Sequence, residues 1–453
     1  MTQLKLPLGW LQVQLGDVVP YGKTQKCELS DVTDDTWVLE LEDVEKECSR
    51  IISRKTANER PFKSTKNRFE RGNVLYGKLR PYLNKVVVAD TDGVCTTEII
   101  PLDSEPFVIN RYLFHWLKSR DFLNYVNEVS YGVNMPRLGT KDGVAAPFVL
   151  APLAEQKVIA DKLDTLLAQV ENTKARLERI PKILKRFRQS VLAAAVNGRL
   201  TEEWRSNLDS YVHASAGDWK WPPIPGTWNV KLYLDLAESR LGKMLDKAKN
   251  SGLPTKYLGN INVRWFDFKL SEVQEILVSE SERAELAIRP GDLLICEGGE
   301  PGRCAIWDGR IEEQIVFQKA LHRARVSDAL IPEWLALNLK HDADSLTLEQ
   351  LFTGTTIKHL TGKALKKYPL RVPPREEQTE IVRRVDQLFA HAGRIEQQVN
   401  KALARVNNLT QSILAKAFRG ELTEQWRKDN PELISGENSA QALLERIKAE
   451  RAA

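Results

Sequence analysis

Apolar residues recur in alternating steps of four and three along two long stretches of the chain. One stripe runs from Ile159 to Val191 and the other from Ile381 to Ile413. This heptad pattern predicts two long α-helices with matching apolar seams, which should pack on each other. The seam positions on which helix packing and subunit docking would depend are Ile159, Leu163, Leu166, Leu177, Leu184, Ile381, Val385, Leu388, Val399 and Ile413.

The expected helix ends have physical causes. Pro152 and Pro374 precede acidic first turns, which suit the positive end of a helix. Gly198 and Gly420 stand where each helix would stop. Pro181 lies inside the first stripe, and because proline removes a helical hydrogen bond, we expect a kink or break near it.

The two stripes belong to a tandem repeat. An offset of 222 residues aligns residues 152–205 with residues 374–427 without a gap, and 18 of these 54 positions are identical, which is too many for chance. The endings NGRLTEEWR, at Arg205, and RGELTEQWR, at Arg427, match closely. Farther upstream, Pro7-Leu-Gly-Trp10 resembles Pro225-Gly-Thr-Trp228. Each copy therefore consists of a variable module followed by a shared helical part.

Within the modules, short apolar runs bounded by turn residues predict a mixture of strands and helices. The segments that begin at Asn73 and Gly291 both read as strand, loop and strand, whereas those from Asn110, Pro332 and Ser439 look helical. The predicted fold class is α+β: two mixed α/β domains separated by two long antiparallel coiled-coil-like helices, in a pseudo-two-fold tandem repeat. The expected boundaries are a first domain at 1–150, a central helical spacer at 151–205, a linker at 206–221, a second domain at 222–372, a distal helical spacer at 373–430 and a C-terminal tail helix at 431–453.

Composition narrows the class of protein. With 453 residues, of which 42% are hydrophobic, the chain can form several packed cores. It has no apolar run long enough for a membrane span, and its start lacks the pattern of a secretory leader. Five cysteines without short paired spacing argue against a disulfide framework. We therefore expect a soluble cytoplasmic protein with no membrane partner.

Charge is segregated along the first module. The formal net charge of +5 decides nothing by itself. However, residues 50–85 hold eleven Lys or Arg and only two acids, whereas residues 28–47 hold nine acids and one Lys. A positive face for a polyanion and an ordinary solvated surface are both open readings of this pattern. A second basic run, from Lys174 to Arg188, would suit a solvated face or an acidic partner better than DNA phosphates.

Several loops combine cations, amides and aromatic residues, which are the groups that contact phosphates and base edges in DNA. The equivalent glycine segments at 131–137 and 353–359 carry different polar residues on one frame, as two different DNA half-sites would require. Surface solubility and simple turn chemistry are the alternatives. The candidate DNA-binding residues are Lys78, Arg80, Tyr82, Asn84, Lys85, Asn134, Arg137, Arg303, Thr356, Lys358, His359 and Lys363.

Cys296 and Cys304 are the candidates for metal ligands. No second Cys or His pair stands at a zinc-like spacing, so buried free thiols are favoured and no metal site is predicted.

The PLAEQK…DTLLAQ segment, its PREEQ…DQLF repeat and the two NGRLTEEWR-like endings resemble the specificity subunit of type I restriction-modification enzymes. The resemblance is strong in the helical repeats and weak in the modules. It implies two target-recognition domains that read the halves of a bipartite, asymmetric double-stranded DNA site. It also implies helices that act as a ruler and dock two methyltransferase (modification) subunits, to which two restriction subunits are added. In that family the partner subunits use S-adenosylmethionine, ATP and Mg, and no cofactor is expected in this chain.

The residues themselves agree with a non-catalytic role. The Pro-Pro pairs at 222–223 and 373–374 lack the flanking Asn or Asp and the aromatic residue of an adenine methyltransferase motif. No Gly-x-Gly-x-x-Gly turn or ATP-binding P-loop is present either. A DNA-recognition subunit is therefore the first hypothesis. The alternative is a coiled-coil scaffold that bridges two proteins without binding DNA, and loss of affinity with added salt would separate the two.

Overall fold

The computed structural model describes residues 6–132, 134–205, 210–217, 219–246, 248 and 250–452. Contacts divide the chain into two units, of which the first spans residues 1–178 and 401–453 and the second spans residues 179–400. Each unit holds one module, the start of one long helix and the end of the other. The domain boundaries expected from the repeat remain predictions. Of the expected linker, residues 206–209 and 218 lie outside the described residues.

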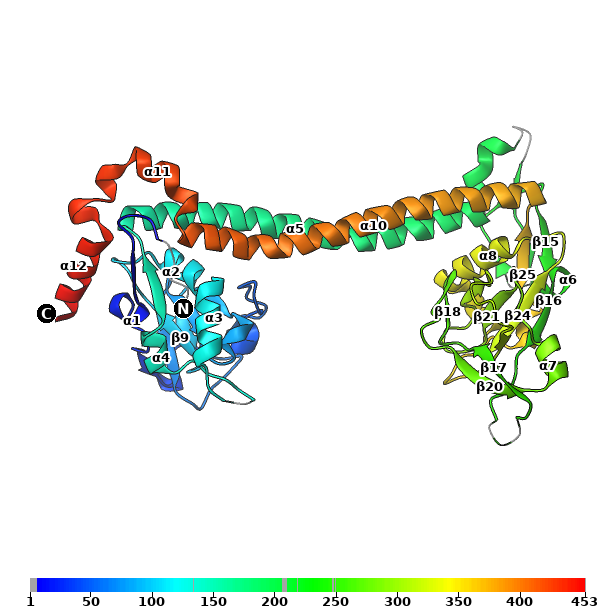
Figure 1. The fold of residues 1–453 in the computed structure, drawn as a ribbon, viewed down its shortest axis with the longest axis horizontal. Helices are drawn as coiled ribbons and strands as arrows, with labels where there is room; N and C mark the ends of the chain where they lie inside the picture. The colour runs from blue at the N-terminus through cyan, green and yellow to red at the C-terminus, as the bar shows by residue number, and fades with distance from the viewer. Residues whose placement is uncertain are drawn as a thin grey trace. The chain divides into compact units, whose positions relative to one another are not determined.

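Both long helices are present. Helix α5 (Leu153–Val196) and helix α10 (Arg375–Phe418) each have 44 residues. In the first unit, Lys162 Nζ near the start of α5 donates to the carbonyl of Leu422, just beyond the end of α10, at 2.8 Å. In the second unit, Arg188 near the end of α5 pairs with Glu396 of α10 at 2.8 Å. The predicted antiparallel packing is thus confirmed within each unit (Figure 1).

The helix ends follow the glycines. Gly198 and Gly420 adopt φ angles of 75° and 74°, a left-handed conformation that glycine enters without a steric penalty. Helix α5 continues through Pro181, so the break that was one of the two expectations is wrong, and the kink stays a prediction. Pro181 is exposed, so water can reach the carbonyl that loses its helical partner there.

The first module is built around three small sheets. Strands β1 and β10 pair antiparallel, a five-stranded sheet has the order β2-β5-β8-β3-β4, and a three-stranded sheet has the order β7-β6-β9. The strands are β1 (Leu11–Gln14), β2 (Lys26–Cys27), β3 (Trp37–Leu39), β4 (Lys55–Thr56), β5 (Lys66–Phe69), β6 (Val74–Gly77), β7 (Val86–Val88), β8 (Gly93–Cys95), β9 (Ile99–Leu102) and β10 (Pro147–Leu150). The helices are α1 (Leu15–Val18), α2 (Asn110–Leu117), α3 (Arg120–Val129) and α4 (Thr140–Val144).

The second module repeats part of this plan. Strands β15 and β25 pair antiparallel, a four-stranded sheet has the order β16-β24-β21-β22, and a three-stranded sheet has the order β20-β17-β23. The strands are β15 (Asn229–Leu232), β16 (Ala237–Leu241), β17 (Leu253–Leu258), β18 (Val263–Arg264), β19 (Asp267–Phe268), β20 (Gln274–Val278), β21 (Leu293–Cys296), β22 (Cys304–Ile306), β23 (Val316–Phe317), β24 (Leu321–Val326) and β25 (Pro369–Val372). The helices are α6 (Tyr233–Leu236), α7 (Glu280–Glu285), α8 (Pro332–Asp344) and α9 (Gly362–Leu365).

The strand–loop–strand segments predicted in each module are confirmed as β6–β7 and β21–β22. In both modules the first of these strands also pairs with a third strand, β9 or β24. The helical segment expected from Asn110 is divided into α2 and α3, because the Ser119 side chain caps a new helix by accepting from Phe122 N. The central strand of each three-strand arrangement therefore occupies an equivalent place in the two modules.

Short elements follow each long helix. After α5 come a 3-10 helix (Arg199–Trp204) and two hairpins, β11 (Tyr211–Val212) with β14 (Ile224–Pro225) and β12 (Ser215–Ala216) with β13 (Trp219–Lys220). After α10 come α11 (Glu424–Asp429) and α12 (Ala440–Ala452). The C-terminal helix expected from Ser439 is confirmed, and it packs beside α1 (Figure 1).

Each core combines distant parts of the sequence. In the first unit, Tyr112 and Phe148 of the module pack with Phe418 at the end of α10 and Leu443 of α12. In the second unit, Trp334 and Leu370 pack with Val196 of α5 and Ile381 of α10. The long helices are therefore part of each module's core. None of the helices in the described part of the chain is long and apolar enough to span a membrane.

Candidate nucleic-acid interface

A closed glycine loop occupies the same place in both modules. Tyr131 and Arg137 exchange backbone hydrogen bonds at the base of the first loop, and Thr353 and His359 do so in the second. Inside the loops, Gly132 and Gly354 have φ angles of 110° and 91°. A Cβ would lie 3.0 Å from the Met135 carbonyl in the first loop and 2.3 Å from the Ile357 carbonyl in the second. Both loops therefore favour glycine at this position. Val133, in the first loop, lies outside the described residues.

A second loop lies beside each glycine loop. We call residues 78–85 and 297–303 the strand loops, because they follow β6 and β21. Leu138 N donates to the Lys78 carbonyl at 3.0 Å, and Leu360 N donates to the Glu297 carbonyl at 2.7 Å. In the first module, Arg80 N also donates to the Pro136 carbonyl at 2.7 Å. The structure thus joins two predicted groups of residues into one surface, and it makes Lys78 the counterpart of Glu297.

The strand loops also share an unusual backbone. Arg80 and Asn84 have φ angles of 50° and 48°, in the left-handed region that non-glycine residues rarely enter. The second strand loop places Gly299 and Gly302 in the same region, with φ angles of 77° and 90°. Asn tolerates this conformation, but Arg80 is held there at a cost in backbone strain, and such strain often accompanies functional loops.

The predicted residues of the first module differ in accessibility. Arg80, Asn134 and Tyr82 are exposed, the tyrosine by 50%. Lys78 is half-buried, and Asn84 is buried. The side chains of Lys85 and Arg137 bind other groups of the same module. Lys85 Nζ donates to the Leu41 carbonyl at 2.7 Å, and burial lowers its pKa. Arg137 pairs with Glu98 at 3.2 Å.

In the second module, Thr356, Lys358, His359 and Lys363 are exposed. Lys358 pairs with Glu349 at 2.7 Å, but both side chains of this pair remain accessible. Arg303 is mostly covered: its guanidinium donates to Glu300 and to the Asn260 carbonyl, both at 2.9 Å. It supports the strand loop.

Sequence reasoning missed the apolar tips of the glycine loops. Met135 and Ile357 stand at equivalent positions, 222 residues apart, and are 44% and 65% exposed. Tyr131 is exposed as well. The repeat offset could have revealed the pairing of Met135 with Ile357. It could not have shown that both side chains face solvent.

Two buried networks tie the modules to the long helices. In the first unit, Trp10 Nε1 donates to Glu155 at 2.7 Å, and Thr423 Oγ1 and Arg427 Nη1 donate to the other carboxylate oxygen, each at 2.6 Å. Arg427 also donates to the carbonyl of Gly420 at 2.7 Å. Glu155 therefore joins the module, the start of α5 and the segment beyond the end of α10.

The second unit repeats this network. Trp228 Nε1 donates to Glu377 at 3.0 Å, Thr201 Oγ1 donates to the same carboxylate at 2.8 Å, and Arg205 adds a third hydrogen bond. Arg205 also donates to the Gly198 carbonyl at 2.6 Å. We call the two arrangements the carboxylate latches. They explain why the shared endings contain Gly, Thr and Arg at fixed spacing.

Comparison with known proteins shows that the two halves match the same family. The family model of the type I restriction modification DNA specificity domain matches the sequence twice, at residues 7–182 and at residues 225–405. The chain belongs to this family. It is 43% identical over 357 residues to the type I restriction enzyme EcoKI specificity subunit of Escherichia coli (strain K12), a match that covers 78% of this chain and 74% of that subunit. The resemblance drawn from the helical repeats is confirmed.

Solved structures show the same fold. A chain from a structure of a type I R-M system, described in terms of complex assembly and conformational transition, aligns with a TM-score of 0.69 at 21% identity. The HsdS subunit from Thermoanaerobacter tengcongensis aligns with a TM-score of 0.60 at 21% identity. Each alignment covers 92% of this chain and 99% of the other. The predicted fold class is confirmed.

A specificity subunit with two target-recognition domains accounts for two modules that share a frame and differ in sequence. The loops of this specificity subunit must then be distinguished from residues that only hold the modules together. Many of the basic residues only hold the modules together. Arg50 pairs with Glu45 at 2.6 Å, and Arg60 and Lys66 pair with Asp43 and Glu40. The acidic segment 28–47 therefore neutralises part of the basic segment 50–85, and a positive face over the whole basic segment is not formed.

Residues 352–375, which lead into α10, hold six Lys or Arg and no acid, and these basic residues are likewise partly internal. Arg371 is fully buried and pairs with Asp342 at 3.1 Å. Arg375 donates to the carbonyls of Asp328 and Leu330. Exposed cations remain at Lys363, Lys366 and Lys367. The positive charge of this region is therefore concentrated on and just after α9, next to the glycine loop in sequence.

The predicted seam positions of the helices are covered to different extents. Ile159, Leu163, Leu184, Ile381, Val385 and Val399 are buried, whereas Leu166, Leu177, Leu388 and Ile413 are half-buried. Phe187 and Leu409, which the heptad pattern also places on the seam, are exposed. The role of the predicted seam positions in docking other subunits stays a prediction.

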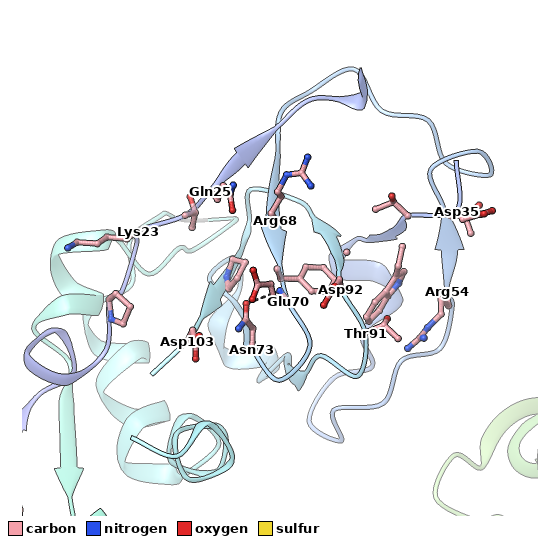
Figure 2. A pocket seen from close by; sticks show the side chains of 18 residues that line it. Lys23, Gln25, Asp35, Arg54, Arg68, Glu70, Asn73, Thr91, Asp92 and Asp103 are labelled. Carbon is pink, nitrogen blue, oxygen red and sulfur yellow. Dashed lines mark hydrogen bonds between the residues drawn. The ribbon is translucent and has the colours of Figure 1, made fainter. Parts of the chain in front are cut away.

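The first module also contains an open cavity of about 740 Å³ that sequence reasoning did not anticipate. Figure 2 shows Arg68 and Gln25 on one side of it and Arg54 and Asp35 on the other. Arg54 stacks on Trp37 at 4.2 Å and pairs with Asp90 at 2.6 Å. Both signs of charge line the cavity, so its electrostatics do not select a polyanion.

Cys296 and Cys304 are buried in adjacent strands. Burial raises the pKa of Cys296 to about 11 and that of Cys304 well above its usual value, so both remain thiols at neutral pH. Within the described residues, no cluster of three or more His, Cys, Asp or Glu side chains is arranged to hold a metal ion.

Proposed function

We propose that the chain is the non-catalytic DNA-recognition subunit of a type I restriction-modification complex, and that each module reads one half of a bipartite, asymmetric duplex site. One observation carries the proposal: both modules present a strand loop and a glycine loop on the same frame but with different exposed side chains. The first surface offers Arg80 and Asn134, and the second offers Thr356 and Lys358. Arg and Asn suit guanine and adenine edges, respectively, while Thr and Lys suit other edges or phosphate.

The partners follow from the same proposal. Two modification subunits would dock on the two halves of the repeat, and two restriction subunits would join through them. The partner subunits would bind S-adenosylmethionine, ATP and Mg and would methylate adenines in the site or cleave unmodified DNA. The residues on which docking would depend are the half-buried and exposed seam positions of the long helices. A cytoplasmic location agrees with five free cysteines among the described residues.

Co-expression with the cognate modification subunit tests this function. Methylated adenines mapped across a genome by long-read sequencing should form a gapped, two-part motif. Exchange of residues 1–150 for those of a related subunit should change one half of the motif and leave the other half and the gap unchanged. A stable complex that methylates no specific sequence would contradict the proposal.

The alternative is a scaffold that bridges two proteins without binding DNA. It explains the repeat and the carboxylate latches, but gives no reason for exposed cations and amides on strained loops. Titration of a fluorescent duplex at several salt concentrations separates the two functions. A DNA-binding subunit loses affinity as counterions are added, whereas a scaffold shows no duplex binding to lose.

A further inference from the structure

The two glycine loops are alike, and the reading of two different half-sites does not explain this likeness. Two modules that read different half-sites should differ where they touch bases, yet both keep the same closed loop and the same glycine backbone. They also keep an exposed apolar side chain at its tip, Met135 in one and Ile357 in the other. A shared feature should serve something that the two half-sites have in common. Every half-site in such a complex must present an adenine for methylation.

Backbone contacts shape both tips in the same way. A Cβ at Gly354 would lie only 2.3 Å from the Ile357 carbonyl, and a Cβ at Gly132 would lie 3.0 Å from the Met135 carbonyl, so both loops are closely packed at these glycines. Backbone hydrogen bonds close each loop and fasten the segment after it to the strand loop. One exposed apolar side chain is common on a protein surface, but its repetition at the same loop position in both modules suggests a shared apolar environment in a complex.

Polar and charged groups around the tips favour DNA over a protein as that environment. The exposed Arg80 lies beside the first glycine loop through its hydrogen bond to Pro136. Lys358 follows Ile357 directly, and Lys363 is exposed on the adjoining helix α9. An exposed cation beside each apolar tip, Arg80 in one module and Lys358 in the other, suits a backbone phosphate next to a base step. Proteins that unstack DNA insert Met, Leu or Ile side chains between bases in this way.

We propose that Met135 and Ile357 are wedge residues, which enter the base stack next to the target adenine of their own half-site. An adenine inside a duplex cannot reach a methyltransferase active site, so it must rotate out of the helix. The wedge residue fills the space that opens and slows the return of the base. This inference rests on the proposed function and adds to it a sequence-independent role in the modules. Readout of the half-site stays with the polar residues of the loops.

The test uses the complex reconstituted with its modification subunit. Fluorescence is read on duplexes that carry 2-aminopurine at one target adenine, and methylation is read on matched duplexes that keep adenine there. In the wild-type complex, binding should raise the fluorescence at either half-site. Met135→Ala should lower the fluorescence rise and the methylation rate at the first half-site by about tenfold or more, and leave the second half-site unchanged. Ile357→Ala should do the reverse. Met135→Leu, which keeps an apolar side chain of similar size, should retain activity.

Two further measurements separate a wedge from a simple contact. A duplex without a base opposite the target adenine is already weakened there, so it should restore methylation by Met135→Ala. Affinity for the intact duplex should change by less than about threefold, because inserting the wedge gains contacts but costs base stacking. Ile52→Ala and Leu253→Ala are matched controls: these side chains are 60% and 57% exposed, lie outside the loops, and should change nothing.

Other outcomes would overturn the inference. Loss of the modification subunit from Met135→Ala in the absence of DNA would make the tips a protein-docking surface. An equal loss at both half-sites, no rescue by the weakened duplex, or unchanged methylation would each refute the wedge alone. A wild-type complex that methylates no gapped sequence would refute the proposed function and the wedge with it.

Discussion

Arg427 Nη1 donates a hydrogen bond of 2.6 Å to Glu155, although 272 residues separate the two in sequence. The Glu155 side chain is fully buried, and it also accepts from Trp10 and Thr423. A buried carboxylate is tolerated only where donors compensate for its lost hydration. The contact therefore fastens the segment beyond α10 to the start of α5 and to the N-terminal strand region.

Glu155→Gln should destabilise the first unit by about 3 kcal/mol, because the amide removes the charge that balances Arg427 and turns an amino group toward existing donors. Glu377→Gln should have a similar effect on the second unit through Arg205. Urea denaturation followed by tryptophan fluorescence measures both, since Trp10 and Trp228 donate to these carboxylates.

Glu421→Gln is a suitable control for the latch variants. Glu421 pairs with Arg419 at 2.7 Å, but both side chains are about half-exposed, and such surface pairs contribute less than about 1 kcal/mol. If Glu155→Gln and Glu421→Gln had equal effects, the latch would have no special part in stability.

A second prediction concerns the buried pair between Asp342 and Arg371. Burial alone would raise the pKa of Asp342, but the Arg371 charge and hydrogen bonds from His341 and Tyr368 outweigh it and lower that pKa. Asp342→Asn should cost about 3–5 kcal/mol, because it leaves a fully buried guanidinium without its counter-charge. The first module has Val149 at the position of Arg371, in an apolar core.

Replacing both partners distinguishes an ion pair from a packing effect. Asp342→Leu combined with Arg371→Leu should recover a large part of the stability that Asp342→Asn loses, as measured by thermal unfolding. Additive losses in the double variant would mean that packing, and not the unbalanced charge, determines the cost.

Much of the scaffold could be predicted from sequence, because its determinants are local or repeated. The heptad stripes gave both long helices, and glycine at 198 and 420 gave their ends. Glu155 and Gln156 are identical to their repeat partners, Glu377 and Gln378. The repeat could not show that the Gln156 side chain accepts from Ile109 N just before α2, as Gln378 does from Ile331 N before α8.

The interface was less predictable, because exposure depends on partners distant in sequence. Lys85 was expected at the surface, but its ammonium group reaches the Leu41 carbonyl. Arg303 was expected to be available, but Glu300 and Asn260 hold it. The charge segregation in the first module could not reveal that acids and bases pair across it.

Acid should destabilise the first unit through His115. Burial, with Lys118 and Arg111 nearby, lowers the pKa of His115 to about 3, so its neutral ring donates to Asp164 at 2.7 Å. The unfolded chain binds a proton below about pH 6.5, whereas the folded chain resists it until about pH 3. Stability should therefore be intact above pH 6.5 and fall as the pH drops through this window.

The loss attributable to this histidine should reach at most about 2 kcal/mol at pH 5. Denaturation midpoints from pH 7.5 to pH 4.5 measure it, and His115→Gln should reduce the slope while lowering stability at pH 7.5. A variant with the same pH slope as the wild type would assign the acid sensitivity to other groups.

Arg80 and Lys85 should differ in their effect on DNA binding, although only five residues separate them. Arg80 is exposed on the strand loop, so Arg80→Gln should weaken duplex binding roughly tenfold and reduce the salt dependence by about one phosphate contact. Lys85 points inward, so Lys85→Gln should leave both unchanged. Fluorescence anisotropy at four salt concentrations gives affinity and slope together. Equal losses from the two variants would place Lys85 at the DNA and contradict the assignment of the surface to Arg80, Tyr82 and Asn134.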